Sequence, residues 1–219
     1  ATVNGTISGA TNITFAGPAD FAGTATIDTT GNITIDGNAQ SAAAISAGTV
    51  TVNGDLDGGS DVSAVLLDIN ATAGEAQLGT VTVGQFDVDD DTNIGQADVT
   101  NDVNLTGGTL KILNGDLLAG GSVNVTGGKL DARQDVTVTG DVIVDGADME
   151  VDGVLSAQSV TVSSTLTAAT LDTDGPVNIN AGQVIASSIT ASEVNIGDGA
   201  GDEAVLKPGS TLDVDTSAL

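Results

Sequence analysis

The sequence predicts an all-β protein: a parallel β-solenoid, or β-helix, with three short strands in each coil of about 17–20 residues. Three observations predict this fold: aliphatic residues that recur in three columns, apolar–polar–apolar triplets, and turn-forming residues between the triplets. Because each coil of a solenoid contacts only its neighbours, we expect residues 1–219 to form one elongated domain. Its register is expected to be looser over residues 1–80 and regular over residues 81–219.

The three columns run through the second half of the chain and interleave with a period of about 18 residues. They consist of Val103, Val123, Val142, Val160, Val177 and Val194; of Leu110, Leu130, Met149, Leu166, Val184 and Val205; and of Leu117, Val136, Leu155, Leu171, Ile189 and Leu212. Each coil contributes one residue to each column. The columns therefore predict three parallel sheets whose inward side chains stack about 4.8 Å apart.

Many column residues open a triplet such as Val123-Asn124-Val125, in which one polar residue separates two apolar ones. Residues i and i+2 of a strand lie on the same face, so each triplet predicts a strand with two inward side chains. Turn formers such as Gly127-Gly128 separate the triplets. A narrow interior of this kind needs no large aromatic residues, and the chain has three Phe and no Trp or Tyr.

The N-terminal third shows the same pattern in triplets such as Ile13-Thr14-Phe15 and Ile33-Thr34-Ile35. Residues 40–47 (QSAAAISA) are compatible with a helical turn and equally with a strand of small residues. Residues 61–75 are less regular, and we expect a protruding loop there. The stretch 197–203 (GDGAGDE) lengthens its coil and is expected to bulge from one corner.

Residues 107–112 (GGTLKI) and 121–132 (GSVNVTGGKLDA) resemble the repeats of filamentous-haemagglutinin-type and autotransporter-passenger proteins. The resemblance covers residues 80–196 clearly and the rest of the chain loosely. Those families form right-handed parallel β-helices on bacterial surfaces, so the resemblance implies a right-handed solenoid and a surface location. It transfers no functional residue to this chain.

Composition excludes several classes of function. Cys and His are absent, which excludes disulfides, imidazole bases and zinc sites of the usual kind. Thirty acids face only Lys111, Lys129, Arg133 and Lys207, for a net charge of −26, so no cationic patch exists to neutralise the phosphates of a nucleic acid. No apolar run approaches the ~18 residues of a membrane span. We expect no nucleic-acid partner and no membrane span.

The start of the chain favours an extracellular, cell-surface location. The chain begins with Ala1 and has no charged-then-apolar leader, as expected of a secreted protein after removal of its signal peptide. An excised fragment of a longer protein would begin in the same way.

The candidate metal site lies in the acidic stretch 87–98. Asp87, Asp89, Asp91, Asn93 and Asp98 occupy positions 1, 3, 5, 7 and 12 of a calcium-loop spacing. Thr92 stands where the turn Gly is expected, and the flanking helices and bidentate Glu are missing, so an acidic solenoid corner is the alternative interpretation. Calcium is the only cofactor expected. Asp198, Asp202 and Glu203, and Asp55, Asp57 and Asp61, are weaker cation candidates.

Paired carboxylates also raise the question of glycoside hydrolysis or lyase chemistry. A glycosidase needs one acid with a raised pKa in an apolar cleft, whereas the acids here lie on turns and no aromatic platform exists for a sugar. β-Helix lyases use basic residues together with calcium, and this chain offers no coherent basic cluster. We therefore expect no enzyme activity and no catalytic residues.

Outward positions predict two further features. The outward residues of the first column are Asn104, Asn124, Ile143, Thr161, Asn178 and Asn195, and stacked Asn side chains can form amide ladders. In the second column Lys111, Asp131 and Glu150 are expected to be vertical neighbours that form an ion pair. Six Asn-X-Thr sequons give glycosylation candidates at Asn4, Asn12, Asn32, Asn70, Asn104 and Asn124, although alternating Asn and Thr also describes any polar strand face.

These observations favour an extracellular structural protein, the subunit of a cell-surface filament that assembles by head-to-tail stacking of solenoids. The expected partner is a second copy of the chain, with a surface glycan or receptor as a further one. The alternatives are the rod or passenger fragment of a surface adhesin, or a module that binds calcium or carbohydrate.

Overall fold

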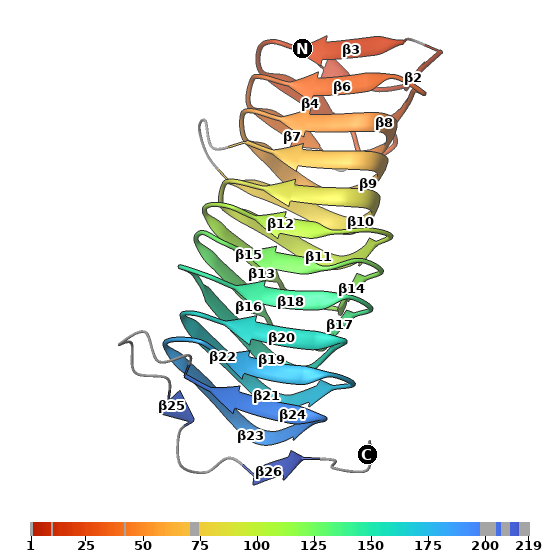
Figure 1. Ribbon diagram of the computed structural model, residues 1–219. Coiled ribbons are helices and arrows are strands. Elements are labelled where there is room, and N and C mark those ends of the chain that lie inside the picture. The colour runs from red at the N-terminus through yellow and green to blue at the C-terminus, as the bar shows by residue number, and fades with distance from the viewer. Residues whose placement is uncertain are drawn as a thin grey trace.

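The computed structural model describes residues 2–9, 11–41, 43–70 and 75–197, and the backbone of residues 205–206 and 211–214. All regular elements in these ranges are β-strands. The strands pair in parallel and wind into a solenoid of about ten turns. Figure 1 shows the coils stacked along one axis, from β3 at one end to β26 at the other. The predicted fold class is confirmed.

The solenoid has three faces, each a parallel sheet named after the column that its inward residues form. The first face contains β3 (Asn12–Phe15), β6 (Asn32–Ile35), β12 (Val103–Leu105), β15 (Val123–Val125), β18 (Asp141–Val144), β20 (Ser159–Val162), β22 (Pro176–Ile179) and β24 (Glu193–Ile196). The second contains β1 (Thr2–Val3), β4 (Ala19–Phe21), β7 (Ala39–Ser41), β13 (Thr109–Ile112), β16 (Lys129–Ala132) and β25 (Val205–Leu206). The third contains β2 (Thr6–Ser8), β5 (Thr26–Asp28), β14 (Leu117–Ala119), β17 (Val136–Val138) and β26 (Thr211–Val214).

Seven longer strands bend through a corner and belong to more than one face. They are β8 (Ala44–Val52), β9 (Leu56–Ile69), β10 (Ala76–Val88), β11 (Thr92–Val99), β19 (Asp148–Ala157), β21 (Thr165–Thr173) and β23 (Gln183–Ala191). For example, β8 pairs with β5 on the third face and with β6 on the first. The three faces are therefore joined by continuous strands at these corners.

The three predicted columns form the core. Val103, Val123 and Val142 lie opposite one another in adjacent strands, and the column continues to Val194. The second and third columns pair in the same way. From residue 103 to residue 189 every member is at most 1% exposed. Burial of each such side chain stabilises the folded state by roughly 1.5–3 kcal/mol.

One column assignment is wrong. Val184 pairs with Leu206, and Val205 lies opposite Gln183. Val205 and Leu206 are adjacent apolar residues that both follow the glycine-rich stretch 197–203, and the period of the column does not fix the length of that stretch. The alternation of apolar and polar residues therefore could not decide which of the two belongs to the second column.

The less regular segments differ from the expectations. Residues 40–41 belong to β7 and residues 44–47 to β8, so the strand interpretation is correct for these residues. Residues 61–69 belong to the 14-residue strand β9 rather than to a protruding loop, and residues 71–74 lie outside the described ranges. The pairing register shifts beside Gly58 and Gly59, whose φ angles are 124° and 74°. These two glycines absorb the extra residues as a bulge.

The N-terminal strands are as well registered as the later ones. The pairs formed among β1 to β8 show no shift, and the register shifts of the described strands occur between β9 and β10 and between β19 and β21. The coil length falls from 20 residues (Ile13 to Ile33) to 17 residues (Ile33 to Val50), which is the same range as later in the chain.

Glycine at one corner is required by close packing between coils. Gly108 and Gly128 have φ angles of 60° and 71°. A Cβ atom on Gly128 would lie 1.8 Å from the carbonyl oxygen of Gly108 in the preceding coil. Only glycine fits both the left-handed backbone and the spacing of about 4.8 Å between coils.

The inward and outward positions of one strand provide a direct test of this core. Val142 is 0% exposed and its neighbour Ile143 is 39% exposed. We expect Val142→Asp to lower the free energy of unfolding by about 3 kcal/mol or more, because it buries an unpaired charge. Ile143→Asp should change it by no more than ~1 kcal/mol. Urea denaturation measures both, and equal losses would contradict the predicted orientation of the strand.

Candidate functional site

A ladder of carboxylate and amide side chains runs along the outside of the first face. Asp68, Asp87, Asn104 and Asn124 occupy the same outward position in four successive coils. Asn124 Nδ2 donates to Asn104 Oδ1 at 2.9 Å, and Asn104 Nδ2 donates to Asp87 Oδ1 at 2.7 Å. Gln85 Nε2 donates to both oxygens of Asp87, at 2.9 and 2.8 Å. The amide ladder predicted from Asn104 and Asn124 is confirmed.

The ladder is interrupted at Ile143 and Thr161 and resumes further along the same face. There Asn195 Nδ2 donates to Asn178 Oδ1 at 3.0 Å. In both segments each amide donates toward the preceding coil. The Asn side chains thus extend the inter-coil hydrogen bonding of the backbone onto the surface.

A second ladder at the adjacent corner was not predicted. Asn70 Nδ2 donates to Asn53 Oδ1 at 3.0 Å, and Asn53 Nδ2 donates to Asp36 Oδ1 at 2.7 Å. The signal that could have found it is the equal spacing of Asp36, Asn53 and Asn70, 17 residues apart, which matches the local coil length. These residues follow the strands rather than lying inside a triplet, so the triplet pattern alone does not select them.

The first ladder borders a shallow concave surface of about 480 Å³. Its lining combines carboxylates, amides and hydroxyls, among them Asp68, Asp87, Asp89, Asn104, Thr106 and Asn124. Most of these polar atoms already form hydrogen bonds with one another within the ladder. In addition, Asp89 Oδ1 accepts a hydrogen bond from Thr106 Oγ1 at 3.3 Å. The surface offers hydrogen-bonding groups on a rigid face and contains no aromatic side chain.

The five predicted calcium ligands are distributed over three faces. Asp87 lies on the first face in β10, Asp89 and Asp91 lie at and just after the corner, Asn93 lies on the second face, and Asp98 lies on the third face in β11. Thr92 is fully buried and points inward, so the chain here is an extended strand rather than a loop that wraps around a cation. The structure does not bring these residues together.

Individual members of that set have protein partners. Asp91 Oδ1 accepts from the backbone N–H of Thr109 at 2.7 Å, and Asn93 donates to Glu75. No group of three or more acidic, His or Cys side chains arranged to hold a metal occurs among the described residues. Of the weaker candidates, Asp198, Asp202 and Glu203 lie outside the described ranges. Calcium binding stays a prediction.

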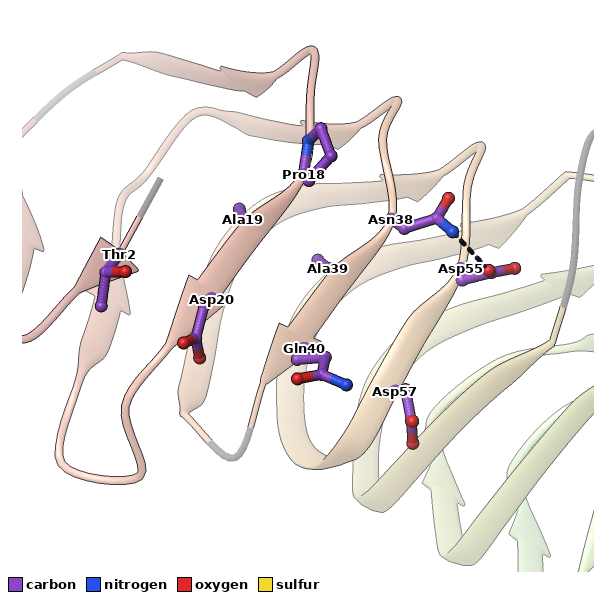
Figure 2. Close-up of a pocket in the computed structure, with 9 residues that line it drawn as sticks. All are labelled: Thr2, Pro18, Ala19, Asp20, Asn38, Ala39, Gln40, Asp55 and Asp57. Atoms are coloured by element: carbon purple, nitrogen blue, oxygen red, sulfur yellow. Dashed lines mark hydrogen bonds between the residues drawn. The ribbon is translucent and has the colours of Figure 1, made fainter.

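A groove of about 440 Å³ lies on the second face near the N-terminal end. Thr2, Asp20, Gln40 and Asp57 occupy successive outward positions along it, as Figure 2 shows. Asn38 Nδ2 donates to Asp55 Oδ2 at 2.7 Å. The other oxygen, Asp55 Oδ1, is buried and has no hydrogen-bond partner among the described residues. The groove is acidic and open, with two of the weaker cation candidates, Asp55 and Asp57, on its wall.

The described cationic residues lie on or beside the second face of two successive coils. Lys111, Asp131 and Glu150 are vertical neighbours, as predicted. The ion pair, however, is formed by Lys129, whose Nζ lies 2.5 Å from Glu150 Oε2. This hydrogen bond raises the pKa of Lys129, while partial burial opposes the shift. Both side chains are more than a third exposed, so the pair contributes little stability.

The structure divides the six sequons into two groups. Asn4, Asn12 and Asn32 are exposed, and all three lie in the first two coils. Asn70, Asn104 and Asn124 are half-buried, and their Nδ2 atoms donate within the ladders. Because Nδ2 is also the atom that carries an N-linked glycan, modification at the second group competes with ladder packing. Glycosylation itself stays a prediction.

The N-terminal end of the solenoid combines apolar exposure with an absence of charged side chains. Among the described strands, β1, β2 and β3 each pair on one side only, with β4, β5 and β6. Inward residues of this first coil (Val3, Ile7, Ile13 and Phe15) are half-buried, whereas Ile27, Ile33 and Ile35 one coil further are 0% exposed. Residues 1–19 contain no Asp, Glu, Lys or Arg.

Comparison with protein-family models, with curated proteins and with solved structures finds no match to this chain. No helix with the length and apolar character of a membrane span occurs among the described residues. The geometry of the faces and ends is therefore the basis for proposing a function.

The first ladder can be tested by a charge placed inside it. Asn104→Asp sets a second carboxylate beside Asp87 and removes the donor to it, so we expect a loss of about 1 kcal/mol in the free energy of unfolding. Thr161→Asp makes the same charge change beside Ile143 and Asn178 and should cost less than ~0.5 kcal/mol. Urea denaturation at low salt measures the difference. A difference that persists in high salt would show that repulsion is not its cause.

Calcium binding is tested separately by thermal unfolding. If Asp87, Asp89 and Asp91 bind calcium, millimolar calcium raises the melting temperature of the wild type, and Asp89→Ala removes most of the gain. Magnesium at the same ionic strength is the control. Equal gains with both cations and in the variant would identify general charge screening instead.

Proposed function

We propose that this chain is an extracellular structural protein, the subunit of a cell-surface filament that grows by head-to-tail stacking of solenoids. The observation that carries the proposal is the first coil, an uncharged and partly apolar strand edge on a highly acidic rod. The resemblance of residues 80–196 to bacterial surface β-helices supports the extracellular location. The related alternative is the rod of a surface adhesin, in which the same edge joins a neighbouring part of a longer chain.

The backbone of the first coil has hydrogen-bonding groups that face away from the solenoid. The carbonyl groups of Thr11 and Phe15 accept from Asn32 and Asp36 in the second coil. Backbone groups alternate in direction along a parallel strand, so the N–H and C=O groups of Asn12 and Thr14 point to the opposite side. A strand edge of this kind favours pairing with a further strand.

The side chains of the first coil also favour contact with a further coil stacked on β3. Phe15 packs edge-to-face on Phe21, with ring centroids 4.8 Å apart and an interplanar angle of 81°. Phe21 is 2% exposed, while Phe15 is only half-buried because no coil lies above it. A coil stacked on β3 would bury Phe15 and Ile13 as fully as their counterparts in the second coil, Ile35 and Ile33.

The opposite end presents a matching edge on the first face. Among the described residues β24 pairs only with β22. Its inward residue Val194 is partly exposed, and its inward residue Ile196 is 49% exposed. The apolar–polar–apolar order Val194-Asn195-Ile196 parallels Ile13-Thr14-Phe15, so the two edges are complementary in pattern.

Charge favours axial over lateral contact. The net charge of −26 comes from acids that begin at Asp20 and recur along the rest of the sequence, and two rods side by side repel one another over a Debye length of about 8 Å. The side chains of the first coil add no charge to this repulsion. A head-to-tail contact is heterologous and does not close, so it produces an open fibre.

The proposal is tested by removing one backbone hydrogen-bond donor, the outward N–H of Thr14, from the exposed edge of β3. Thr14→Pro removes the outward N–H from β3, while Thr14→Val retains it and serves as the matched control. We expect wild type and Thr14→Val to form filaments with an axial repeat of about 50 Å, the length of ten or eleven coils. Thr14→Pro should remain monomeric while keeping the circular dichroism of a folded solenoid. Electron microscopy and sedimentation measure the outcome.

Two outcomes would contradict the proposal. One is a wild type that stays monomeric at high concentration and high salt. The other is a Thr14→Pro variant that forms the same filaments as Thr14→Val.

A further inference from the structure

The chain contains three Asn-Gly dipeptides: Asn4-Gly5, Asn53-Gly54 and Asn114-Gly115. Asn followed by Gly is chemically labile, because a Gly residue leaves the peptide nitrogen unhindered. That nitrogen attacks the side-chain carbonyl carbon of Asn, and a C–N bond forms as the C–NH₂ bond breaks. The nitrogen loses its proton and ammonia leaves. Water then opens the cyclic imide to aspartate or isoaspartate.

The attack needs a Gly N–H that can lose its proton and an Asn side chain that can rotate. At Asn53-Gly54 the coils restrain both, and at Asn114-Gly115 they hold the Gly N–H, while the Asn114 side chain is exposed. Gly54 N–H donates to Ile35 C=O at 3.2 Å, and the Asn53 side chain bonds to Asp36 and Asn70. Gly115 N–H donates to the carbonyl of Gly95 at 2.9 Å, the same carbonyl that accepts from Asn114 N–H.

The first dipeptide lacks these restraints. Asn4 and Gly5 join β1 to β2 in the first coil, and Asn4 is exposed. Neither residue forms a hydrogen bond with another described residue outside the strand ladders. A Cβ atom added to Gly5 would meet no atom within 4 Å, so the space on that side of the backbone is open.

We propose that Asn4 is a site of spontaneous deamidation in the folded protein, and that the inter-coil bonds protect Asn53 and Asn114. The reaction needs only water as co-reactant. Its products place a carboxylate in residues 1–19, which otherwise carry no charged side chain. The isoaspartate product also adds one backbone carbon between β1 and β2.

A consequence that rests on the proposed function is that deamidation inactivates the stacking edge. A new charge at the uncharged end would have to be desolvated beside the next subunit. The longer backbone would displace β2 relative to β1, and the first coil would no longer match the spacing of its partner. Stacking competence would then decline as the protein ages.

The modification is tested by peptide mass spectrometry on full-length protein. The protein is incubated in warm, mildly alkaline buffer and cleaved after Asp, which yields peptides 1–20, 37–55 and 103–116. In the folded protein we expect deamidation at Asn4 to be about tenfold faster or more than at Asn53 or Asn114, because the latter two react only after local opening. In the urea-unfolded protein the three rates should converge.

Two results would overturn the proposal. One is deamidation of Asn53 or Asn114 in the folded protein as fast as at Asn4. The other is a rate at Asn4 that increases on unfolding as strongly as the rates at the two protected sites. Because masses are measured on each peptide, neither result depends on whether the protein assembles.

A second variant separates the chemistry from its consequence. Gly5→Ala hinders the attack and fits without steric conflict, so it should slow deamidation at Asn4 without affecting folding. Aged wild type should then lose filament formation while aged Gly5→Ala keeps it. If fresh protein forms no filaments, the proposed function fails and the mass measurement still decides the modification.

Discussion

The constraint on which the structure depends is in-register parallel stacking, in which each inward side chain lies above its counterpart in the previous coil. Val103, Val123, Val142 and Val160 illustrate it. Within the three columns, the first inward residue of each strand is aliphatic in successive coils, whereas the second inward residue on the second face alternates in size, as in the stack Ile112, Ala132, Val151 and Ala168. The three columns described above therefore consist of similar aliphatic residues. The same spacing forces glycine at corners such as Gly128 and brings outward Asn side chains close enough to form ladders.

Stacking gives every coil a neighbour on both sides, except for the coils at the two ends. Within the solenoid a strand such as β6 has a neighbour on both sides, whereas β3 has one. This asymmetry leaves Ile13 and Phe15 half-buried. The interaction that holds the coils together is thus available to a further coil at the end. The acidic faces oppose every other mode of close contact, which links the fold of one chain to the proposed filament.

The sequence predicted the fold because column residues and triplets report directly on burial and strand period. It predicted the Asn104–Asn124 ladder for the same reason, since both residues occupy the centre of a triplet. The assignment of Val205 to the second column was wrong, and residues 61–69 lie in a strand, because insertions and glycine bulges change coil length without changing composition. The spacing of Asp87 to Asp98 resembled a calcium loop, but a strand with Thr92 buried sends these side chains to three faces.

The central claim is that the first coil is an open edge that a second copy completes. Hydrogen–deuterium exchange of the monomer and of the assembled protein tests it most directly. In the monomer we expect amides of residues 12–15 to exchange faster than those of residues 32–35, and in the assembled state we expect both segments to be protected. Assembly that leaves residues 12–15 unprotected while slowing exchange along the faces would contradict the claim.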